Sequence, residues 1–172
     1  MPDMLVKLYT LPDNRENIEK LKEQGIYIKR ALAPDKIQVV NYVKNNFGEG
    51  WASECDVAFS KDPVSCFIAV KDKKVVGFAC YNATCKDYFG PIGVDKELRG
   101  YGIGKALFLE CLHSLRNEGY AYAIIGAAGK NAIPFYEKVA GAKVIDDSVP
   151  GVYHFSPCYF LIKRNGILPC SS

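Results

Sequence analysis

The sequence has little net charge, few histidines and no long apolar run, and each shortage excludes a class of protein. Its 172 residues carry a formal net charge of only +3, spread evenly enough that no nucleic-acid-binding surface is expected. No apolar stretch approaches the length of a transmembrane helix, so we expect no membrane association. Residues Met1 to Met4 lack the charged start and apolar core of a signal peptide. We therefore expect a cytoplasmic protein.

Cysteine is present, but its spacing predicts neither disulfides nor a metal site. The seven cysteines form no Cys-x-x-Cys pair, and there are only two histidines, so the ligand spacing of a zinc site is missing. Cys66, Cys80 and Cys111 fall inside apolar patterns, where free cysteine behaves as a small hydrophobic residue. This usage fits a reducing compartment, and we expect no metal.

The length and composition fit one globular domain, and hydrophobic periodicity places its elements. The expected order is strand 5–11, helix 16–24, strand 26–32, helix 34–46, a short helix or ordered loop 51–59, strands 66–70, 75–83 and 88–94, a helix from 103, strand 120–125, a helix capped by Asn131, and strands 143–145 and 152–163. Hairpins combined with crossover helices predict an α/β fold, a single layered domain with a mixed central sheet and helices on both faces.

The stretch from Val94 to Leu107 is the most informative about function. Gly100, Gly102 and Gly104 stand between a short apolar strand and a long helical pattern. Glycine lets the backbone turn tightly and approach a ligand closely, and the start of a helix offers unpaired N–H groups to an anion. Arg99 adds a fixed positive charge beside the turn. The sequence therefore predicts a site for a phosphorylated cofactor at this helix start.

The spacing of the glycines narrows the choice of cofactor. It fits neither the Gly-x-Gly-x-x-Gly dinucleotide fingerprint nor the P-loop. The pattern Arg99-x-x-Gly102-x-Gly104 resembles the pyrophosphate-binding motif of the GNAT acetyltransferases. Asn131, the run 135–137 (Phe-Tyr-Glu) and the pair 141–142 (Gly-Ala) resemble the later helix of that family, so the likeness extends roughly over residues 64 to 146.

The resemblance implies a GNAT-like domain over residues 26–166, preceded by a strand–helix extension over 1–25. It also implies acetyl-CoA as co-substrate and a splayed strand pair that admits its pantetheine arm near Val94. The cofactor-binding residues that it implies are Ile92, Gly93, Val94, Arg99, Gly100, Tyr101, Gly102, Ile103, Gly104, Lys105, Asn131 and Tyr136.

Tyr136 matches the tyrosine that serves in the family as general acid toward the departing thiolate. Because a phenol titrates near 10 and a thiol near 8.5, this transfer is chemically reasonable. The alternative is a core aromatic residue, since either Tyr136 or the adjacent Phe135 must face inward. For Asn131, the alternative to a cofactor contact is a plain helix N-cap. For Lys105, the alternative is a charge exposed to solvent.

The acceptor side is predicted from the segment Trp51–Asp56. Either Glu54 or Asp56 can take the proton or hold a polar acceptor, and Glu54 is the candidate general base. Trp51 can stack on a sugar face. Asp87 and Tyr88, which enter the central strand, are further candidates on the acceptor side, and Asp87 or a water molecule is the alternative base. The alternative for Glu54 and Asp56 is an exposed helix charge. Cys55 as an acyl-carrying nucleophile is a remote alternative, because nothing near it in the sequence indicates a lowered pKa.

We therefore expect an acetyl-CoA-dependent N-acetyltransferase that acts on a small polar amine by direct attack on the thioester. An amino sugar is slightly favoured, with an amino acid, a polyamine, an aminoglycoside or a protein N-terminus as the other acceptors. The main alternative is a non-catalytic CoA-binding sensor or structural module on the same fold. The partner is then a small-molecule amine, and a homodimer is compatible with the family.

Overall fold

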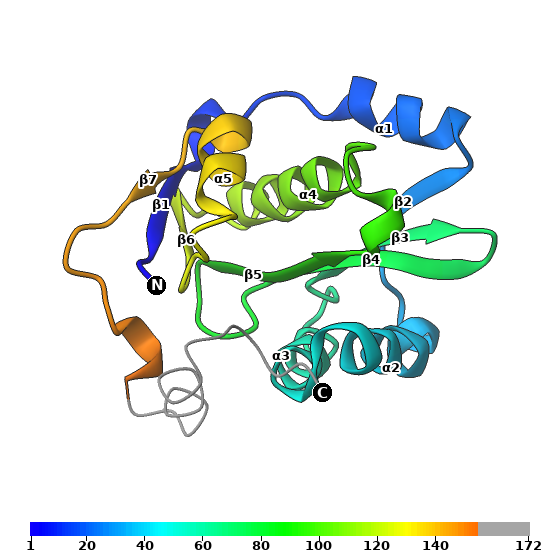
Figure 1. Ribbon diagram of the computed structural model, residues 1–172, viewed down its shortest axis with the longest axis horizontal. Coiled ribbons are helices and arrows are strands. Elements are labelled where there is room, and N and C mark those ends of the chain that lie inside the picture. The colour runs from blue at the N-terminus through cyan, green and yellow to red at the C-terminus, as the bar shows by residue number, and fades with distance from the viewer. Residues whose placement is uncertain (155–172) are drawn as a thin grey trace.

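The computed structural model describes residues 1–154, which form one seven-stranded mixed sheet with helices on both faces (Figure 1). The strands lie in the order β2-β3-β4-β5-β6-β1-β7. Their bounds are β1 Met4–Lys7, β2 Ile26–Arg30, β3 Cys66–Lys71, β4 Lys74–Tyr81, β5 Tyr88–Val94, β6 Tyr122–Ile125 and β7 Lys143–Val144. The helices are α1 Arg15–Glu23, α2 Lys36–Phe47, α3 Glu49–Ala58, α4 Ile103–Asn117 and α5 Ile133–Ala140. The predicted α/β layered architecture is confirmed.

One face of the sheet carries α1, α4 and α5 (Figure 1). Helix α4 is buried along its predicted stripe, Ile103, Leu107, Cys111 and Leu115, so that expectation is confirmed. The helix also buries further apolar side chains, among them Phe108, because α1 and α5 cover the sides that the sheet leaves open. Burying one such large side chain contributes about 1.5–3 kcal/mol to folding, so α4 anchors this half of the core.

The opposite face carries α2 and α3 (Figure 1). Phe47 at the end of α2 stacks on Trp51 of α3, with ring centroids 5.6 Å apart, and both rings contact Phe78 of β4. Phe47 also lies directly on β5 at Gly93, where a Cβ atom would come within 2.5 Å of the ring. The missing side chain at Gly93 therefore lets α2 approach the sheet.

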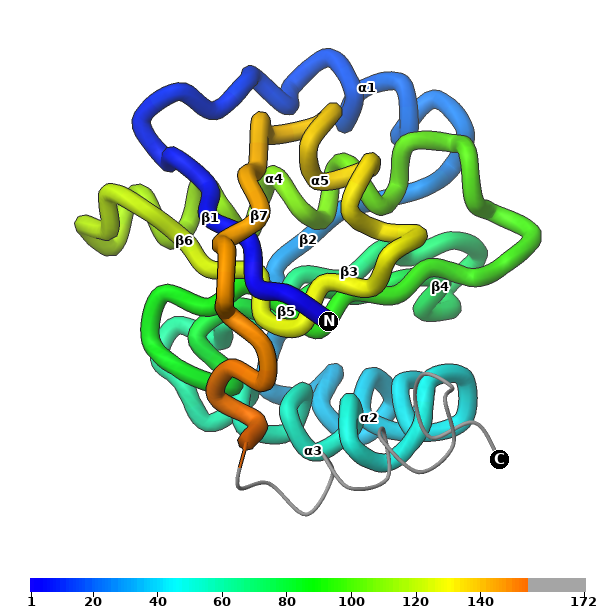
Figure 2. Tube along the Cα trace, turned by 60° about the vertical axis from the view of Figure 1, so that its left-hand side comes forward, coloured from blue at the N-terminus to red at the C-terminus, as the bar shows by residue number. Residues whose placement is uncertain are grey.

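The N-terminal strand β1 is inserted between β6 and β7 and runs antiparallel to both (Figure 2). Asp3, just before this strand, is buried, and its carboxylate accepts a hydrogen bond from the Ala127 N–H at 2.8 Å. The Asp3 N–H donates to the Ser148 hydroxyl at 2.8 Å. The start of the chain is thus part of the same sheet as the later strands.

Some predicted bounds differ from the structure. The expected strand 5–11 is strand only to Lys7, and Leu8–Thr10 form a 3-10 turn. The expected strand 152–163 is wrong at its start, since Gly151–Tyr153 form another 3-10 turn, and its part from residue 155 lies outside the described residues.

Within residues 1–154, no helix is both long and apolar enough to cross a membrane.

We expect Asp3→Ala to lower the free energy of unfolding by about 1–3 kcal/mol, because it leaves the Ala127 N–H without its acceptor. Urea unfolding followed by circular dichroism measures the change. Asp13→Ala is the matched control: Asp13 forms an exposed ion pair with Arg15, so its loss changes stability far less. Equal effects of the two substitutions would contradict a structural role for Asp3.

Candidate active site

The candidate site begins where β5 and β6 stop pairing. These parallel strands pair only at Tyr88 with Ile124 and at Phe89 with Ile125. Beyond Phe89, β5 continues to Val94 with β4 as its only partner among the described strands. Within residues 1–154, one edge of β5 is therefore free of a neighbouring strand over its second half, as the predicted splayed strands require.

The free edge of β5 presents backbone hydrogen-bonding groups. The Asp95 N–H donates to the Val76 carbonyl of β4 at 3.0 Å. Because successive residues of a strand direct their N–H and C=O groups to opposite sides, Val94 and Ile92 turn theirs away from β4. The Arg99 Nε–H reaches the Val94 carbonyl at 3.4 Å on that outer side. An extended ligand arm with amide groups could pair with this edge in the manner of an added strand.

The glycine turn lies at the end of that edge and opens α4. Gly100 and Gly102 have φ angles of +89° and +94°, which favour glycine strongly. No heavy atom lies within 4 Å of the position where a Cβ of Gly100 would stand. Ala106 is the first residue of this turn to bond back along the chain, to the Gly102 carbonyl at 3.0 Å. In the described part of the chain the N–H groups of residues 103–105 have no backbone acceptor and can bind an anion.

Helix α1 supports this turn, which the sequence did not indicate. The Asn17 side-chain amide donates to the Gly102 carbonyl at 3.2 Å, and its oxygen lies 2.6 Å from the position of a Cβ on Gly102. Asn14 is buried and donates to the Ala106 carbonyl and to Glu110, both at 3.0 Å. Two asparagines of the N-terminal segment thus hold the first turns of α4. The sequence signal was only a pair of amides three residues apart.

Two cationic side chains, those of Arg99 and Lys105, lie near the glycine turn and also interact with other parts of the protein. Arg99 is exposed and donates to the Val94 carbonyl, so it flanks both the turn and the free strand edge. Lys105 is half-buried and lies near Glu16 of α1; the pKa of Glu16 is lowered first by its hydrogen bond to Lys20 and further by Lys105. Tyr101 is exposed. Both positive charges could contact an anion at the turn.

Helix α5 places Tyr136 in an aromatic cluster. Its ring contacts Phe89, Phe108 and Phe135 at centroid distances of 5.2 to 6.2 Å. Among the described residues its hydroxyl has no hydrogen-bond partner, and burial raises the pKa of Tyr136 to about 12. A phenol with this pKa transfers its proton to a thiolate less readily than an ordinary tyrosine does. Tyr136 therefore packs as a core aromatic residue, and among the described residues its hydroxyl remains an unpaired donor.

Asn131 is exposed and does not cap α5, so the expectation of a side-chain cap is wrong. The helix begins at Ile133, with Ala132 in the capping position. Phe135, rather than Tyr136, faces the glycine turn: its ring lies 3.8 Å from the position of a Cβ on Gly104.

On the opposite face of the sheet, Glu54 forms a polar cluster with two hydroxyl groups. The hydroxyls of Thr84 and Tyr153 donate to its carboxylate, the latter at 3.3 Å. Burial raises the pKa of Glu54, and the two hydrogen bonds oppose this shift. Tyr153 in turn lies beside Gly126, against which the ring of Tyr88 also packs. Glu54 therefore lies near the point where β5 and β6 part.

The structure does not bring the remaining acceptor candidates together. Asp56 is exposed and pairs with Lys36 at 3.0 Å, since two residues along a helix point to nearly opposite sides. Trp51 is half-buried with one face stacked on Phe47. Asp87 directly precedes β5 at the paired end of the strand. Its carbonyl accepts a hydrogen bond from the Ile124 N–H at 2.9 Å, and burial raises the pKa of its carboxyl group. Of these, only Trp51 lies on the same helix face as Glu54.

Cys55 is fully buried and so cannot meet a thioester. Hydrogen bonds from the thiols of Cys66 and Cys80 lower its pKa, a shift without consequence for acyl transfer at a site closed to substrate.

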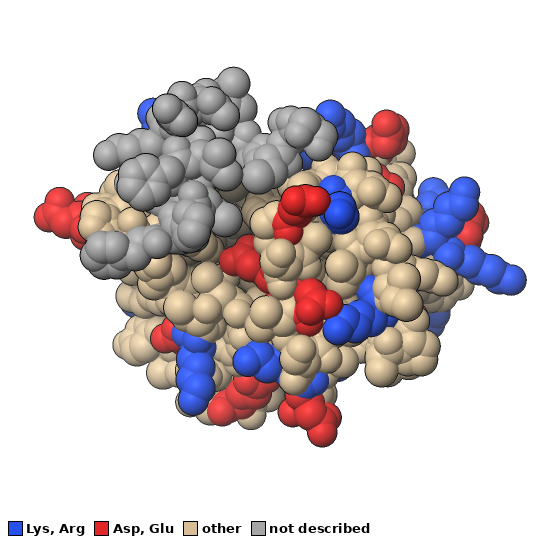
Figure 3. Space-filling model, turned by 90° about the horizontal axis from the view of Figure 1, so that it is seen from below, with Lys and Arg blue, Asp and Glu red and all other residues tan. Residues whose placement is uncertain are grey.

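On the surface of this face, acidic and basic side chains are interspersed across the visible part (Figure 3), in keeping with the small net charge.

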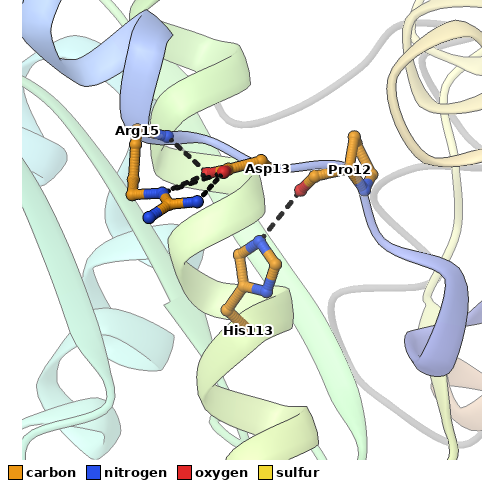
Figure 4. Close-up of polar contacts among 4 residues, drawn as sticks. All are labelled: Pro12, Asp13, Arg15 and His113. Atoms are coloured by element: carbon orange, nitrogen blue, oxygen red, sulfur yellow. Dashed lines mark hydrogen bonds and ion pairs between the residues drawn. The ribbon is translucent and has the colours of Figure 1, made fainter.

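A surface hollow of about 380 Å³ lies away from the glycine turn, between α4 and the segment before α1. Here His113 Nε2 lies 3.1 Å from the Pro12 carbonyl, next to the Asp13–Arg15 ion pair (Figure 4). Because a carbonyl only accepts, Nε2 carries the proton. Nδ1 is buried and has no hydrogen-bond partner among the described residues. Sequence reasoning did not single out this histidine.

In the described part of the chain, the unpaired edge of β5 leads to the glycine turn at the start of α4. This arrangement suits a ligand that combines an extended arm with a phosphate group. The model of the acetyltransferase (GNAT) family matches residues 36–142. The chain belongs to this family, whose members generally use acetyl-CoA, and the match supports an acyltransferase. The search of curated proteins found no match.

Solved structures share the fold. A glucosamine N-acetyltransferase region of a fungal multi-domain β-N-acetylglucosaminidase has a TM-score of 0.66 at 15% identity, covering 84% of this chain and 19% of that one. A GCN5-related N-acetyltransferase from Sphaerobacter thermophilus has a TM-score of 0.61 at 20% identity, covering 84% and 48%. An aminoglycoside acetyltransferase from an uncultured soil metagenomic sample has a TM-score of 0.50 at 18% identity, covering 68% and 88%. The chain thus spans less than half the length of the first two.

We expect Thr84→Val to raise the pKa of Glu54 further, because the Thr84 hydroxyl donates to the ionised carboxylate and thereby lowers that pKa. A pH titration of the Glu54 side-chain carboxyl by carbon-13 NMR measures the shift. Ser53→Ala is the control: Ser53 is exposed, and within residues 1–154 its hydroxyl donates only to the Glu49 carbonyl. A Glu54 pKa that stays constant or falls in Thr84→Val would contradict the hydrogen bond.

Proposed function

We propose that the protein is an acetyl-CoA-dependent N-acetyltransferase in which Glu54 accepts a proton from a small polar amine. The observation that carries this proposal is the placement of Glu54, a partly buried carboxylate with a raised pKa, close to where β5 and β6 part. Family membership supports the acyl-transfer chemistry.

The cofactor is assigned to the side of the sheet that carries α4. The N–H groups of residues 103–105 and the Arg99 guanidinium would hold the pyrophosphate, and the outer edge of Ile92 and Val94 would pair with the pantetheine arm. Acetyl-CoA supplies the acetyl group as a thioester. The residues present fit such a ligand, because the glycine turn has open space at Gly100 and β5 has a free edge.

Glu54 is suited to act on the amine. An alkyl ammonium must lose a proton before it can attack a carbonyl, and a base whose pKa lies above the usual carboxylate value accepts that proton more readily. Thr84 and Tyr153 orient the Glu54 carboxylate by their hydrogen bonds. Trp51 on the same helix provides an apolar wall.

Tyr136 is assigned a hydrogen bond to the departing sulfur. It packs on Phe89, while the neighbouring Tyr88 packs near Gly126 and Tyr153 on the Glu54 side. Tyr136 and Glu54 therefore flank the last paired residues of β5 from opposite faces. Since the pKa of Tyr136 is about 12, donation of a hydrogen bond is favoured over full transfer of the proton.

The acceptor class is an amino sugar or a related amino-substituted ring. Trp51 next to a carboxylate with two hydroxyl partners suits a ligand that combines an apolar ring face with polar groups. Two of the proteins with the same fold are described as a glucosamine and an aminoglycoside acetyltransferase. A panel of amines with acetyl-CoA, followed by release of free thiol, ranks the acceptors.

We expect Gly102→Ala to weaken acetyl-CoA binding at least about tenfold, or 1.4 kcal/mol. The new Cβ stands at a φ of +94° and 2.6 Å from the Asn17 oxygen, so the turn must shift. Isothermal titration calorimetry measures the affinity. Gly25→Ala is the matched control, with a φ of +73° and open space at the end of α1. If both variants fold and bind acetyl-CoA equally well, the glycine turn is not part of the cofactor site.

We expect Glu54→Gln to lower kcat/KM for the amine by roughly 10²- to 10⁴-fold, the usual contribution of a general base, with acetyl-CoA affinity unchanged. In the parent, kcat/KM rises with pH as Glu54 loses its proton, and in the variant this limb is absent. Steady-state kinetics over a pH series measure both effects. Asp56→Asn, on the same helix but paired with Lys36, should behave as the parent. Equal losses in the two variants would contradict Glu54 as the base.

A further inference from the structure

Three buried cysteines from three separate elements converge between α3 and the sheet. Cys55 lies on α3, Cys66 on β3 and Cys80 on β4, and none of them has exposed surface. Their three sulfur atoms all lie within 4.8 Å of one another. The spacing of these cysteines along the chain carries no metal-site motif, because the fold alone brings them together.

Strand register and helix packing account for the cluster. Cys66 and Cys80 are opposite each other across the β3–β4 pair. The neighbouring pair is hydrogen-bonded, from the Tyr81 N–H to the Ser65 carbonyl at 3.0 Å, so the two cysteines form a non-hydrogen-bonded pair, in which side chains approach closely. The buried face of α3 then places Cys55 against them.

The triangle of sulfur atoms has a size that an ion can occupy. The centre of an equilateral triangle with 4.8 Å sides lies about 2.8 Å from each corner. A bond between a thiolate and a first-row metal ion is about 2.3 Å long. An inward movement of at least about 0.5 Å by each sulfur would therefore bring the three thiols within bonding distance of one central atom.

The apolar surroundings of the three thiols favour an ion whose charge balances that of three thiolates. The three cysteines belong to a buried hydrophobic cluster whose other members are Ala31, Val39, Val43, Ala52, Ala58, Ile68 and Phe78. A charged complex is costly in such a core unless a counter-charge lies nearby. Three thiolates carry three negative charges, so a monovalent or divalent ion would leave a net charge there. A trivalent ion leaves none.

We propose that Cys55, Cys66 and Cys80 form a buried trithiol site for a trivalent thiophilic ion, with arsenite as the soluble form that reaches it. Arsenous acid, As(OH)3, reacts with three thiols to give one arsenic atom bonded to three sulfurs and three water molecules. Three As–O and three S–H bonds break, three As–S bonds form, and each thiol proton leaves with a hydroxide as water. Neither arsenic nor sulfur changes oxidation state, and the bound ion links α3 to the β3–β4 hairpin.

The test uses the full chain under reducing conditions, with Cys85, Cys158 and Cys170 replaced by serine so that only the cluster and Cys111 remain. Arsenite is added in mild urea, which opens the buried site, and the urea is then removed. Native mass spectrometry is expected to show one arsenic atom bound and three hydrogen atoms lost per chain. X-ray absorption at the arsenic edge is expected to show three sulfur neighbours and no oxygen.

Single substitutions within the cluster provide the second arm. Cys55→Ala, Cys66→Ala and Cys80→Ala should each weaken arsenite binding by at least the roughly 10- to 100-fold that changing even an outer-shell partner costs a metal site. Cys111→Ala is the matched control, since Cys111 is equally buried and lies outside the cluster. Circular dichroism establishes that each variant is folded.

The absence of an adduct on the refolded parent would overturn the proposal, as would an adduct that has lost only two hydrogen atoms. Parent-like binding by a folded variant that lacks a cluster cysteine would also overturn it. The absorption spectrum of the parent decides the outcome even where a variant does not fold, because a site with fewer than three sulfur neighbours is not the proposed one.

Discussion

The parting of β5 from β6 is the constraint on which the rest of the site depends. Pairing ends at Phe89 and Ile125, and from there β5 has one edge that no other described strand pairs with. That edge begins between Tyr136 on one face of the sheet and Tyr88, Tyr153 and Glu54 on the other, and it leads to the glycine turn at the start of α4. Unpaired backbone groups along a strand and at a helix start are available for a ligand, and here both lie on one continuous path.

Close backbone packing holds this path in place from both sides. On one face, Phe47 at the end of α2 lies on Gly93 of β5 and stacks on Trp51 of α3, the helix that also carries Glu54. On the other, Asn14 and Asn17 of the N-terminal segment donate to carbonyls of the first turns of α4. The N-terminal strand also lies within the sheet, between β6 and β7. The first 25 residues therefore support the candidate cofactor turn through hydrogen bonds as well as through the sheet.

Sequence reasoning predicted well where a local pattern was strong. The buried stripe of α4, the β3–β4 hairpin and the layered sheet follow from apolar periodicity and turn residues. It predicted less well where contacts are distant in the chain. Asn131 was expected to cap α5 and does not. Asp56 was grouped with Glu54, but the helical rotation between them turns Asp56 toward Lys36. The support from Asn17 depends on a packing of α1 on α4 that no local pattern contains.

The sequence by itself determined the α/β class, the glycine turn before α4 and the resemblance to the GNAT family, because each rests on residue types at fixed short spacings. Only the tertiary structure decided which side chains meet. It buried Tyr136 among aromatic rings and raised its pKa, gave Glu54 two hydroxyl partners, and gathered Cys55, Cys66 and Cys80 into one cluster. Burial and desolvation arise from contacts between elements far apart in the chain, so the chemistry of these groups follows from the fold.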